Sequence, residues 1–213
     1  MKADILRSVS CLFILFLFLG CSQEDQVIEP ENEGIQLSLV NQVEHTITPT
    51  TIEINEPTQF SLSTRNNRPV QIARGNYIGP LGSEIKFRAI DNSRRVMGTL
   101  DLEGTFFGAI KGRPLCATTN EMGEAVVAYF LEYVEIPYLN IVENGIVWVK
   151  YKDNGSGNNG ISDQVSEFVL TYPNWDEAFD SPEDVMSVLG CDAVFNFEGF
   201  GSFIDVEGNL KVL

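Results

Sequence analysis

One continuous apolar segment lies near the N-terminus of the chain. It is followed by short segments in which apolar and polar residues alternate. Residues 11–19 contain no polar residue. Alternation over four to eight residues is typical of a β-strand with one buried face, and the Thr and Ile of the first alternating segments favour a pleated surface. The alternating or apolar segments lie at residues 46–48, 51–54, 59–63, 84–90, 124–133, 145–151 and 165–172.

The spacing of these segments predicts the fold class. The segments at 145–151 and 165–172 flank a connection rich in glycine and asparagine, which predicts two neighbouring antiparallel strands. A bend rich in glycine and proline is expected at residues 75–82. Many short strands, frequent turn residues and little helix predict an all-β domain, an antiparallel β-sandwich over residues 35–172.

One helix is predicted after the strands. Ser181 is placed to cap it, Pro182 suits its first turn, and Gly190 is placed to end it. Farther on, aromatic and aliphatic residues between Phe195 and Val206 predict a hairpin with its turn at 207–209. Residues 173–213 are therefore expected to form a helix and hairpin appendage packed on the sandwich.

Three stretches, at residues 68–73, 119–129 and 145–149, read RPVQIA, TNEMGEAVVAY and GIVWV. In this order they resemble the Pro-Val-x-x-Ala turn, the Thr-x-x-x-Gly-x-Ala stretch and the late Gly-x-Val-x-Val strand of bacterial Ig-like domains of the intimin/invasin type. The resemblance covers residues 45–172, with residues 74–84 as an insertion. It implies an Ig-like sandwich with an adhesive or structural role and no chemistry to transfer.

The N-terminal segment has the organisation of an export signal. Lys2 and Arg7 precede the apolar run, and a small residue, Gly20, follows it. A positive end, an apolar run of this length and a small residue at the cleavage site are typical of a secretory signal. The run is too short for a transmembrane helix, which needs about 20 apolar residues.

The residue after Gly20 is Cys21, which makes the segment resemble a bacterial lipoprotein signal. Phe18 and Leu19 depart from the usual residues of that signal. The resemblance implies that residues 1–20 are removed and that Cys21 becomes a lipidated N-terminus, which anchors the chain in a membrane. A plain secretory signal is the alternative.

Residues 22–34 contain five acidic residues and no basic one. Such a segment cannot bury enough apolar surface to fold, so residues 21–34 are predicted to be a flexible acidic tether. The residues QED at 23–25 resemble the short acidic signal that sends some Bacteroidetes lipoproteins to the outer face of the outer membrane. The expected location is the outer membrane, with exposure at the cell surface as one outcome.

The formal net charge of −16 argues against nucleic acid and against an anionic membrane surface as partners. The charge is unevenly spread, because residues 153–213 contain only one basic residue, Lys211. One interpretation places the basic strands beside this acidic tail, and the other is a basic patch for an anionic glycan. The basic residues concerned are Arg65, Arg68, Arg74, Lys86, Arg88, Arg94 and Arg95.

Cys116 and Cys191 are left once Cys11 is removed with the signal and Cys21 is lipidated. An exported chain folds in an oxidising compartment, so one disulfide between them is predicted, with two buried free thiols as the alternative. The sequence contains neither a CxxC motif nor a Cys/His cluster, and no structural zinc is expected.

Candidate chemistry is sparse, and no catalytic, cofactor-binding or metal-binding residue is assigned. His45 is the only histidine, so a His-dependent triad would need it, yet it precedes the clear strands. Residues 153–163 resemble an Asp-rich calcium loop, but Gly155 and Gly157 stand where two carboxylates belong, so calcium is not expected. A pair of carboxylates for glycoside hydrolysis would need a cleft that a sequence cannot show.

Aromatic side chains are the candidates for stacking on sugar rings. Trp148 lies in a predicted strand and is expected in the core, whereas Trp175 lies in a turn-like segment. Tyr138 and Tyr172 are the other two candidates. An exposed Trp175 would favour glycan binding, two close carboxylates in a cleft an enzyme, and a free sheet edge adhesion by strand addition.

Together these features predict a membrane-anchored envelope lipoprotein that is a non-enzymatic binding or adhesion module without a cofactor. Its partner would be a protein or a glycan. A glycan-binding accessory lipoprotein for polysaccharide capture is the main alternative, and a carboxylate-based glycan hydrolase is the second.

Overall fold

The computed structural model describes residues 34–52, 70–79, 82–92, 95–104, 108–155 and 161–213. The chain divides into two units, Met1–Glu33 and Gly34–Leu213, and every described residue belongs to the second. The predictions for the signal, for Cys21 and for the acidic tether fall outside the described residues, as does the predicted strand at 59–63.

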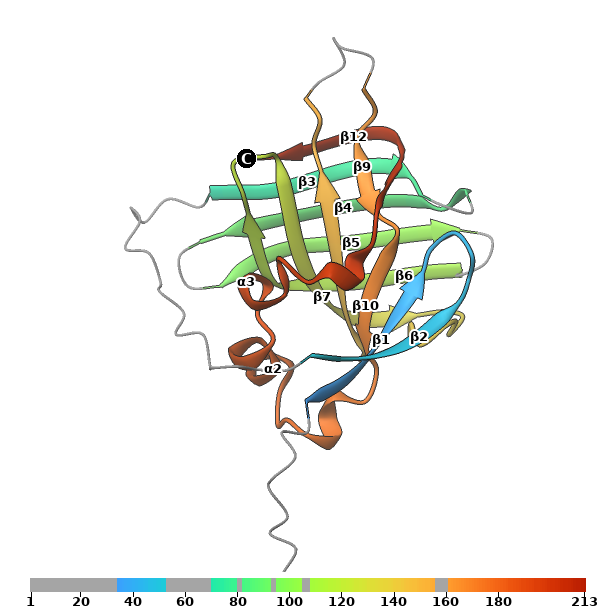
Figure 1. Cartoon of the computed structure of the whole chain (residues 1–213), viewed down its shortest axis with the longest axis vertical. Helices are drawn as coiled ribbons and strands as arrows, with labels where there is room; N and C mark the ends of the chain where they lie inside the picture. The colour runs from blue at the N-terminus through green and yellow to red at the C-terminus, as the bar shows by residue number, and fades with distance from the viewer. Residues whose placement is uncertain (1–33, 53–69, 80–81, 93–94, 105–107, 156–160) are drawn as a thin grey trace, which may run out of the picture. The chain divides into compact units, whose positions relative to one another are not determined.

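The described residues form a twelve-stranded antiparallel sheet (Figure 1). Its main path has the order β12-β3-β4-β5-β6-β7-β8-β10-β1-β2, with β9 paired to β8 and β11 paired to β9. The strands are β1 (Ile35–Asn41), β2 (Ile47–Ile52), β3 (Val70–Ile78), β4 (Glu84–Asp91), β5 (Val96–Gly104), β6 (Gly108–Thr119), β7 (Glu124–Val134), β8 (Ile146–Lys152), β9 (Gln164–Ser166), β10 (Phe168–Tyr172), β11 (Phe203–Asp205) and β12 (Glu207–Val212).

The all-β prediction is confirmed, and the Ig-like sandwich is not. From β3 to β8 each strand pairs with the next one along the chain, so this part is a meander in one sheet. Short connections favour pairing of consecutive strands, and here every connection from β3 to β7 is short. The predicted pairing across the glycine-rich connection is also confirmed, since β8 pairs with both β9 and β10.

Residues 75–78 belong to β3, although the sequence predicts a bend there. Gly75 explains the difference, because a Cβ at this position would lie 2.4 Å from the ring of Phe87 and 2.5 Å from the side chain of Leu210. The glycine therefore serves close packing inside a strand rather than a turn.

The sheet is curled, so that strands far apart in its order face one another. Tyr77 on β3 and Tyr151 on β8 have ring centroids 6.4 Å apart, although four strands separate β3 from β8. The inner face of the curl carries one cluster of buried side chains, the inner cluster, which includes Phe87, Leu100 and Leu131.

A second cluster, the outer cluster, covers the opposite face of β7 and β8. Alternate residues of these strands enter the two clusters, as with Val127 and Val126 on β7. Burial on both faces explains why β7 reads as a continuous apolar run. The C-terminal segment covers the outer face with η2 (Trp175–Glu177), α2 (Pro182–Val188), α3 (Cys191–Val194) and η3 (Glu198–Phe200) (Figure 1).

The predicted helix is confirmed as α2. The Ser181 hydroxyl accepts a hydrogen bond from the backbone N–H of Asp184 at 3.2 Å, and Pro182 occupies the first turn. The helix is shorter than expected, since Leu189 is its C-terminal cap and Gly190 caps the start of α3.

The predicted C-terminal hairpin is wrong. β11 pairs with β9 and β12 pairs with β3, so both strands join the sheet instead of each other. Two acidic side chains stabilise β12 in this position. The carboxylate of Asp163 accepts a hydrogen bond from the N–H of Leu210 at 2.7 Å, and that of Asp153 accepts one from the N–H of Val212 at 3.1 Å. The C-terminal strand is therefore hydrogen-bonded on both edges.

Candidate functional site

A cavity of about 90 Å³ lies among the side chains of the inner cluster. We call it the inner cavity. Most of its wall is aliphatic, and its residues come from β1, β3, β4, β5, β6, β7, β8 and β10. They are Val40, Asn41, Gln42, His45, Tyr77, Ser83, Ile85, Leu100, Leu102, Ile110, Leu131, Leu139, Ile141, Val147, Val149, Tyr151 and Val169.

One end of the curl gathers four polar residues of the wall, Asn41, Gln42, His45 and Ser83. The β1–β2 turn lies beside the end of β3 and the start of β4 at the right of Figure 1. Asn41 shapes this turn, since its side-chain oxygen accepts the N–H groups of Val43 at 2.7 Å and Glu44 at 2.6 Å. His45 follows with a positive φ of 58° and contacts the ring of Tyr138 at 6.3 Å between centroids. This end, which we call the mouth, is held by local hydrogen bonds.

Exposed apolar side chains gather around the mouth. Val43 and Ile78 are 51% and 43% exposed and line one shallow groove. Ile47, beside the turn, is also exposed. An apolar ligand approaching the cavity would therefore meet exposed apolar side chains, with Asp205 and Glu207 in the same groove.

Three tyrosines form the polar part of the interior. The hydroxyl groups of Tyr129 and Tyr151 are 3.3 Å apart, and the ring of Tyr151 stacks on Phe87 at 4.1 Å between centroids. Burial is the main cause that raises the pKa of Tyr77, Tyr129 and Tyr151 well above the usual value. All three hydroxyl groups are therefore neutral at physiological pH.

Ser83 differs from the tyrosines because its hydroxyl has no hydrogen-bond partner among the described residues. The residue is 1% exposed and lines the inner cavity. A Cβ added to Gly104 would lie 2.2 Å from the Ser83 Oγ. Gly104 follows Leu100 and Leu102 on the inward side of β5, so the hydroxyl occupies space on the inner face of the sheet.

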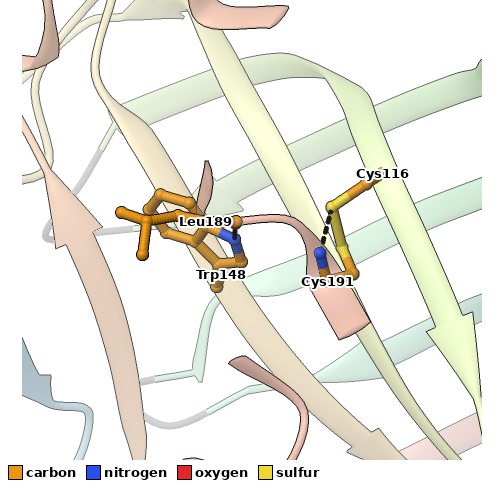
Figure 2. Close-up of a disulfide and its surroundings, with 4 residues drawn as sticks. All are labelled: Cys116, Trp148, Leu189 and Cys191. Atoms are coloured by element: carbon orange, nitrogen blue, oxygen red, sulfur yellow. Dashed lines mark hydrogen bonds between the residues drawn. A yellow bond between two sulfur atoms is a disulfide. The ribbon is translucent and has the colours of Figure 1, made fainter. Parts of the chain in front are cut away.

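The outer cluster is fastened by a covalent bond (Figure 2). Cys116 on β6 and Cys191 on α3 form the predicted disulfide, with an S–S distance of 2.07 Å. Beside it, the indole N–H of Trp148 donates to the carbonyl oxygen of Leu189 at 3.2 Å. These contacts attach the C-terminal helices to the sheet.

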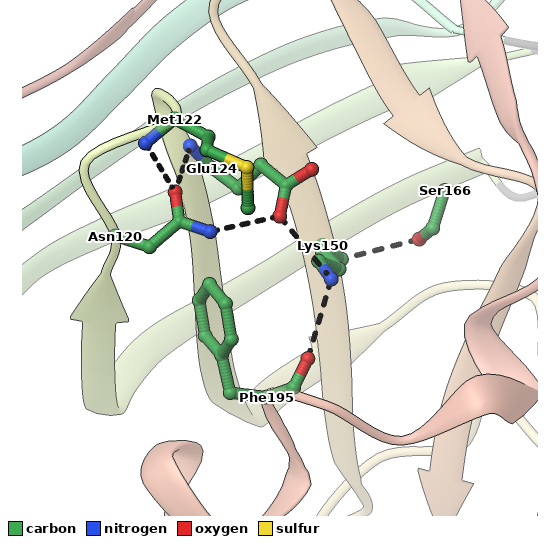
Figure 3. Close-up of polar contacts among 6 residues, drawn as sticks. All are labelled: Asn120, Met122, Glu124, Lys150, Ser166 and Phe195. Carbon is green, nitrogen blue, oxygen red and sulfur yellow. Dashed lines mark hydrogen bonds and ion pairs between the residues drawn. The ribbon is translucent and has the colours of Figure 1, made fainter.

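Lys150 anchors the next segment of the C-terminal region (Figure 3). Its Nζ lies 3.5 Å from a carboxylate oxygen of Glu124 and donates to the carbonyl oxygen of Phe195 at 3.2 Å. Glu124 also accepts the side-chain N–H of Asn120, whose oxygen accepts the N–H groups of Met122 and Glu124 at 3.0 Å. These contacts hold the start of β7, β8 and the segment after α3 together.

Three of the four aromatic candidates for sugar stacking are buried, and Tyr138 is half-buried. Trp148 is fully buried, and Trp175 is 8% exposed with its indole N–H donated to the carbonyl oxygen of Asn144. Tyr172 is 9% exposed, and Tyr138 contacts His45 at the mouth. The structure therefore does not bring these four side chains together as a stacking surface.

The remaining sequence candidates also have structural surroundings. Asp153 and Asp163, the ends of the calcium-like loop, direct their oxygens at backbone N–H groups, and residues 156–160 between them lie outside the described residues. Within the described ranges, no group of three or more His, Cys, Asp or Glu side chains could hold a metal ion.

The expected proximity of the basic strands to the acidic tail is realised only in part. β12 lies beside β3, but it brings Lys211 opposite Arg74, which is itself opposite Arg88 on β4. Three cationic residues thus follow one another across the sheet. Lys86 is paired with Glu84 at 2.8 Å.

Sequence reasoning missed Ser83, Tyr77 and Tyr151 as residues of one site. Alternation at 84–90 indicates which side chains of β4 face inward, but it does not reveal that β3 and β8 face each other across the curl. No sequence signal distinguishes Ser83 from other turn serines.

Comparisons with family models, with curated proteins and with solved structures each find no match. Among the described residues, the helices are all too short or too polar to cross a membrane.

Proposed function

We propose that the chain is an outer-membrane lipoprotein, anchored through Cys21, that binds the apolar part of a small ligand in its inner cavity without transforming it. The observation that carries the proposal is the largely aliphatic cavity, with the exposed side chains of Val43 and Ile78 near its mouth. Small-molecule sites are typically concave, mostly apolar and furnished with a few polar groups, as this one is.

The energetic cost of the cavity supports this function. A cavity costs about 24 cal/mol for each Å³, so 90 Å³ corresponds to about 2 kcal/mol of lost stability. Larger side chains at a few inward positions would recover that stability. A retained void of this size is therefore consistent with a space that is filled when a ligand binds.

The size of the cavity limits what it can hold. An engineered apolar cavity of about 150 Å³ admits benzene, so a cavity of 90 Å³ admits a few carbon atoms. We infer that a ligand inserts one apolar end and leaves its remainder at the mouth, among the exposed apolar side chains.

The other functions draw less support. Glycan capture by aromatic stacking would require an exposed Trp175, but this side chain is buried. Adhesion by strand addition would use β2, which in the described part of the chain pairs only with β1. β2 contains Pro49, which cannot donate to an added strand. An Ig-like domain could serve either glycan capture or strand addition. The meander topology of this sheet, however, does not support an Ig-like relationship.

A titration with linear 1-alkanols from four to ten carbons tests the proposal. The signals to follow are the ¹³C-methyl resonances of the mature lipidated chain in detergent. Each buried CH₂ contributes about 0.8 kcal/mol, so affinity should rise about fourfold for each carbon until the cavity is full. The methyl groups of Leu100, Ile110 and Leu131 should shift first.

Matched variants locate the site. Val147→Phe fills the inner cavity and should abolish these shifts, whereas Val188→Phe adds the same volume on α2 and should leave them unchanged. Shifts confined to Val43 and Ile78, or an affinity independent of chain length, would contradict binding in the cavity.

A further inference from the structure

We infer that the inner cavity selects ligands that carry an uncharged polar group within their apolar end, and that the Ser83 hydroxyl binds this group. The inference rests on the proposed function, since it names the chemistry of the ligand at the same site. The expected ligand is a short or tapered ketone, alcohol or ester rather than a pure hydrocarbon or an ion.

The Ser83 hydroxyl lacks the hydrogen bond that a buried hydroxyl normally makes. A buried hydroxyl almost always has a hydrogen-bond partner, because leaving it unpaired costs the free energy of its desolvation. Ser83 is 1% exposed and its Oγ has no partner among the described residues. A ligand atom in the cavity would supply the missing partner.

The surroundings of Ser83 are built to keep this hydroxyl in place. Gly104 leaves room on the inward side of β5 for the Ser83 side chain, because any larger residue there would place its Cβ 2.2 Å from the Oγ. The backbone carbonyl of Ser83 accepts the N–H of Gly79 at 2.8 Å, which closes the turn between β3 and β4. The main chain is therefore fixed beside the cavity, and the side-chain hydroxyl makes no hydrogen bond within the described residues.

The charge of the cavity wall determines whether the polar group of the ligand can be ionic. No Lys, Arg, Asp or Glu is among the residues that line the inner cavity, and the histidine among them, His45, lies at the mouth. The tyrosine hydroxyl groups are neutral and interact with one another. A carboxylate or an ammonium group would lose its hydration without gaining an opposite charge, so an ionic group is excluded from the interior by its desolvation cost.

The position of Ser83 decides where the polar group lies in the ligand. Ser83 precedes β4, at the same end of the curl as the mouth, and Ile85 and Leu100 lie farther along the wall. A ligand that pairs with Ser83 would thus place its polar atom near the mouth and its alkyl end against the aliphatic wall.

Three probes of equal carbon number test the inference: 2-pentanone, n-pentane and pentanoate, each titrated into the mature chain and followed by the same methyl resonances. The wild-type chain should bind 2-pentanone more tightly than n-pentane, and pentanoate least. Ser83→Ala should weaken 2-pentanone about tenfold, which corresponds to about 1.4 kcal/mol, and leave n-pentane unchanged or tighter.

Ser166→Ala is the matched control. Ser166 is also 1% exposed, but its hydroxyl donates to the carbonyl oxygen of Phe168 at 2.7 Å and it lies outside the cavity wall. This variant should keep the preference for 2-pentanone. Equal losses for 2-pentanone and n-pentane in Ser83→Ala, or tight binding of pentanoate in the interior, would overturn the inference while leaving the cavity as a binding site. If no probe shifts the cavity methyl groups, the proposed function itself fails and the inference with it.

Discussion

The two faces of β7 and β8 are both buried, yet they are buried in different ways. On the outer face, helices cover the sheet, a disulfide joins Cys116 to Cys191, and the indole of Trp148 is hydrogen-bonded. On the inner face, the sheet packs against itself, leaves a cavity and contains a hydroxyl without a partner. The difference suggests that stability is concentrated on the outer face, so that the inner face can keep the imperfectly filled core at which we propose binding.

Removal of the disulfide should have the largest effect. Cys116 and Cys191 are 75 residues apart, and closing a loop of this length in the unfolded chain stabilises the fold by about 4 kcal/mol in the chain-entropy treatment. We expect the double variant Cys116→Ala/Cys191→Ala to lose this amount in urea unfolding. If the outer face contributes to stability but not to ligand binding, the folded variant should still bind 2-pentanone more tightly than n-pentane. A loss below about 1 kcal/mol would show that the outer face does not depend on this bond.

The two buried serines should respond in opposite directions. Ser166→Ala leaves partners of its hydroxyl without a hydrogen bond and should reduce the free energy of unfolding by about 2 kcal/mol. Ser83→Ala removes a hydroxyl that has no partner, so it should raise the free energy of unfolding of the ligand-free chain by about 1 kcal/mol. Urea unfolding of both variants measures the difference. A destabilised Ser83→Ala would mean that this hydroxyl is already satisfied in the free protein.

Alkaline pH should destabilise the inner face. Burial raises the pKa of Tyr77, Tyr129 and Tyr151 well above 10.0, while in the unfolded chain these groups lose their protons near 10. Their contribution is therefore complete below pH 10 and is lost as the pH rises from there toward the folded-state values. The free energy of unfolding should fall by about 1.4 kcal/mol per pH unit for each tyrosine.

Tyr151→Phe provides the control for this slope. The variant has one titrating tyrosine fewer in the inner cluster, so the slope above pH 10 should be smaller by about 1.4 kcal/mol per pH unit. Urea unfolding at several pH values between 8 and 11.5 gives both slopes. Identical slopes would contradict a coupled, buried tyrosine cluster.

The smallest effect is expected where the sheet is not covered by helices. Lys211 stands directly opposite Arg74, and like charges in this position destabilise a sheet by a few tenths of a kcal/mol. Lys211→Gln should therefore raise the free energy of unfolding slightly at low salt. Lys86→Gln is the comparison, because Lys86 is paired with Glu84 and should give no gain. An equal change in the two variants would indicate a general effect of net charge.

The sequence predicts the local features of this fold better than its topology. Ser181, Pro182 and the alternation at 84–90 act through neighbouring residues, and the helix and strand they predict are present. The Cys116–Cys191 bond follows from the small number of cysteines. The placement of β12 does not follow from local pattern, because it depends on Asp153 and Asp163, which reach it from the β8–β9 connection.

The candidate site was less predictable than the fold. Its wall requires β3 and β8 to meet through the curl, and curl depends on the accumulated twist of many strands. Gly75 shows how a single residue type misleads, since the sequence suggests a turn where the glycine in fact admits the ring of Phe87. Ser83 gains its significance only from the cavity around it.

The most direct test of a functional inner face is a structure of the chain with 2-pentanone bound. We expect the ligand in the inner cavity, with its carbonyl oxygen accepting a hydrogen bond from the Ser83 hydroxyl and its alkyl end against Leu100 and Ile110. An empty cavity with the ligand on the outer face, or on the exposed side chains alone, would contradict it.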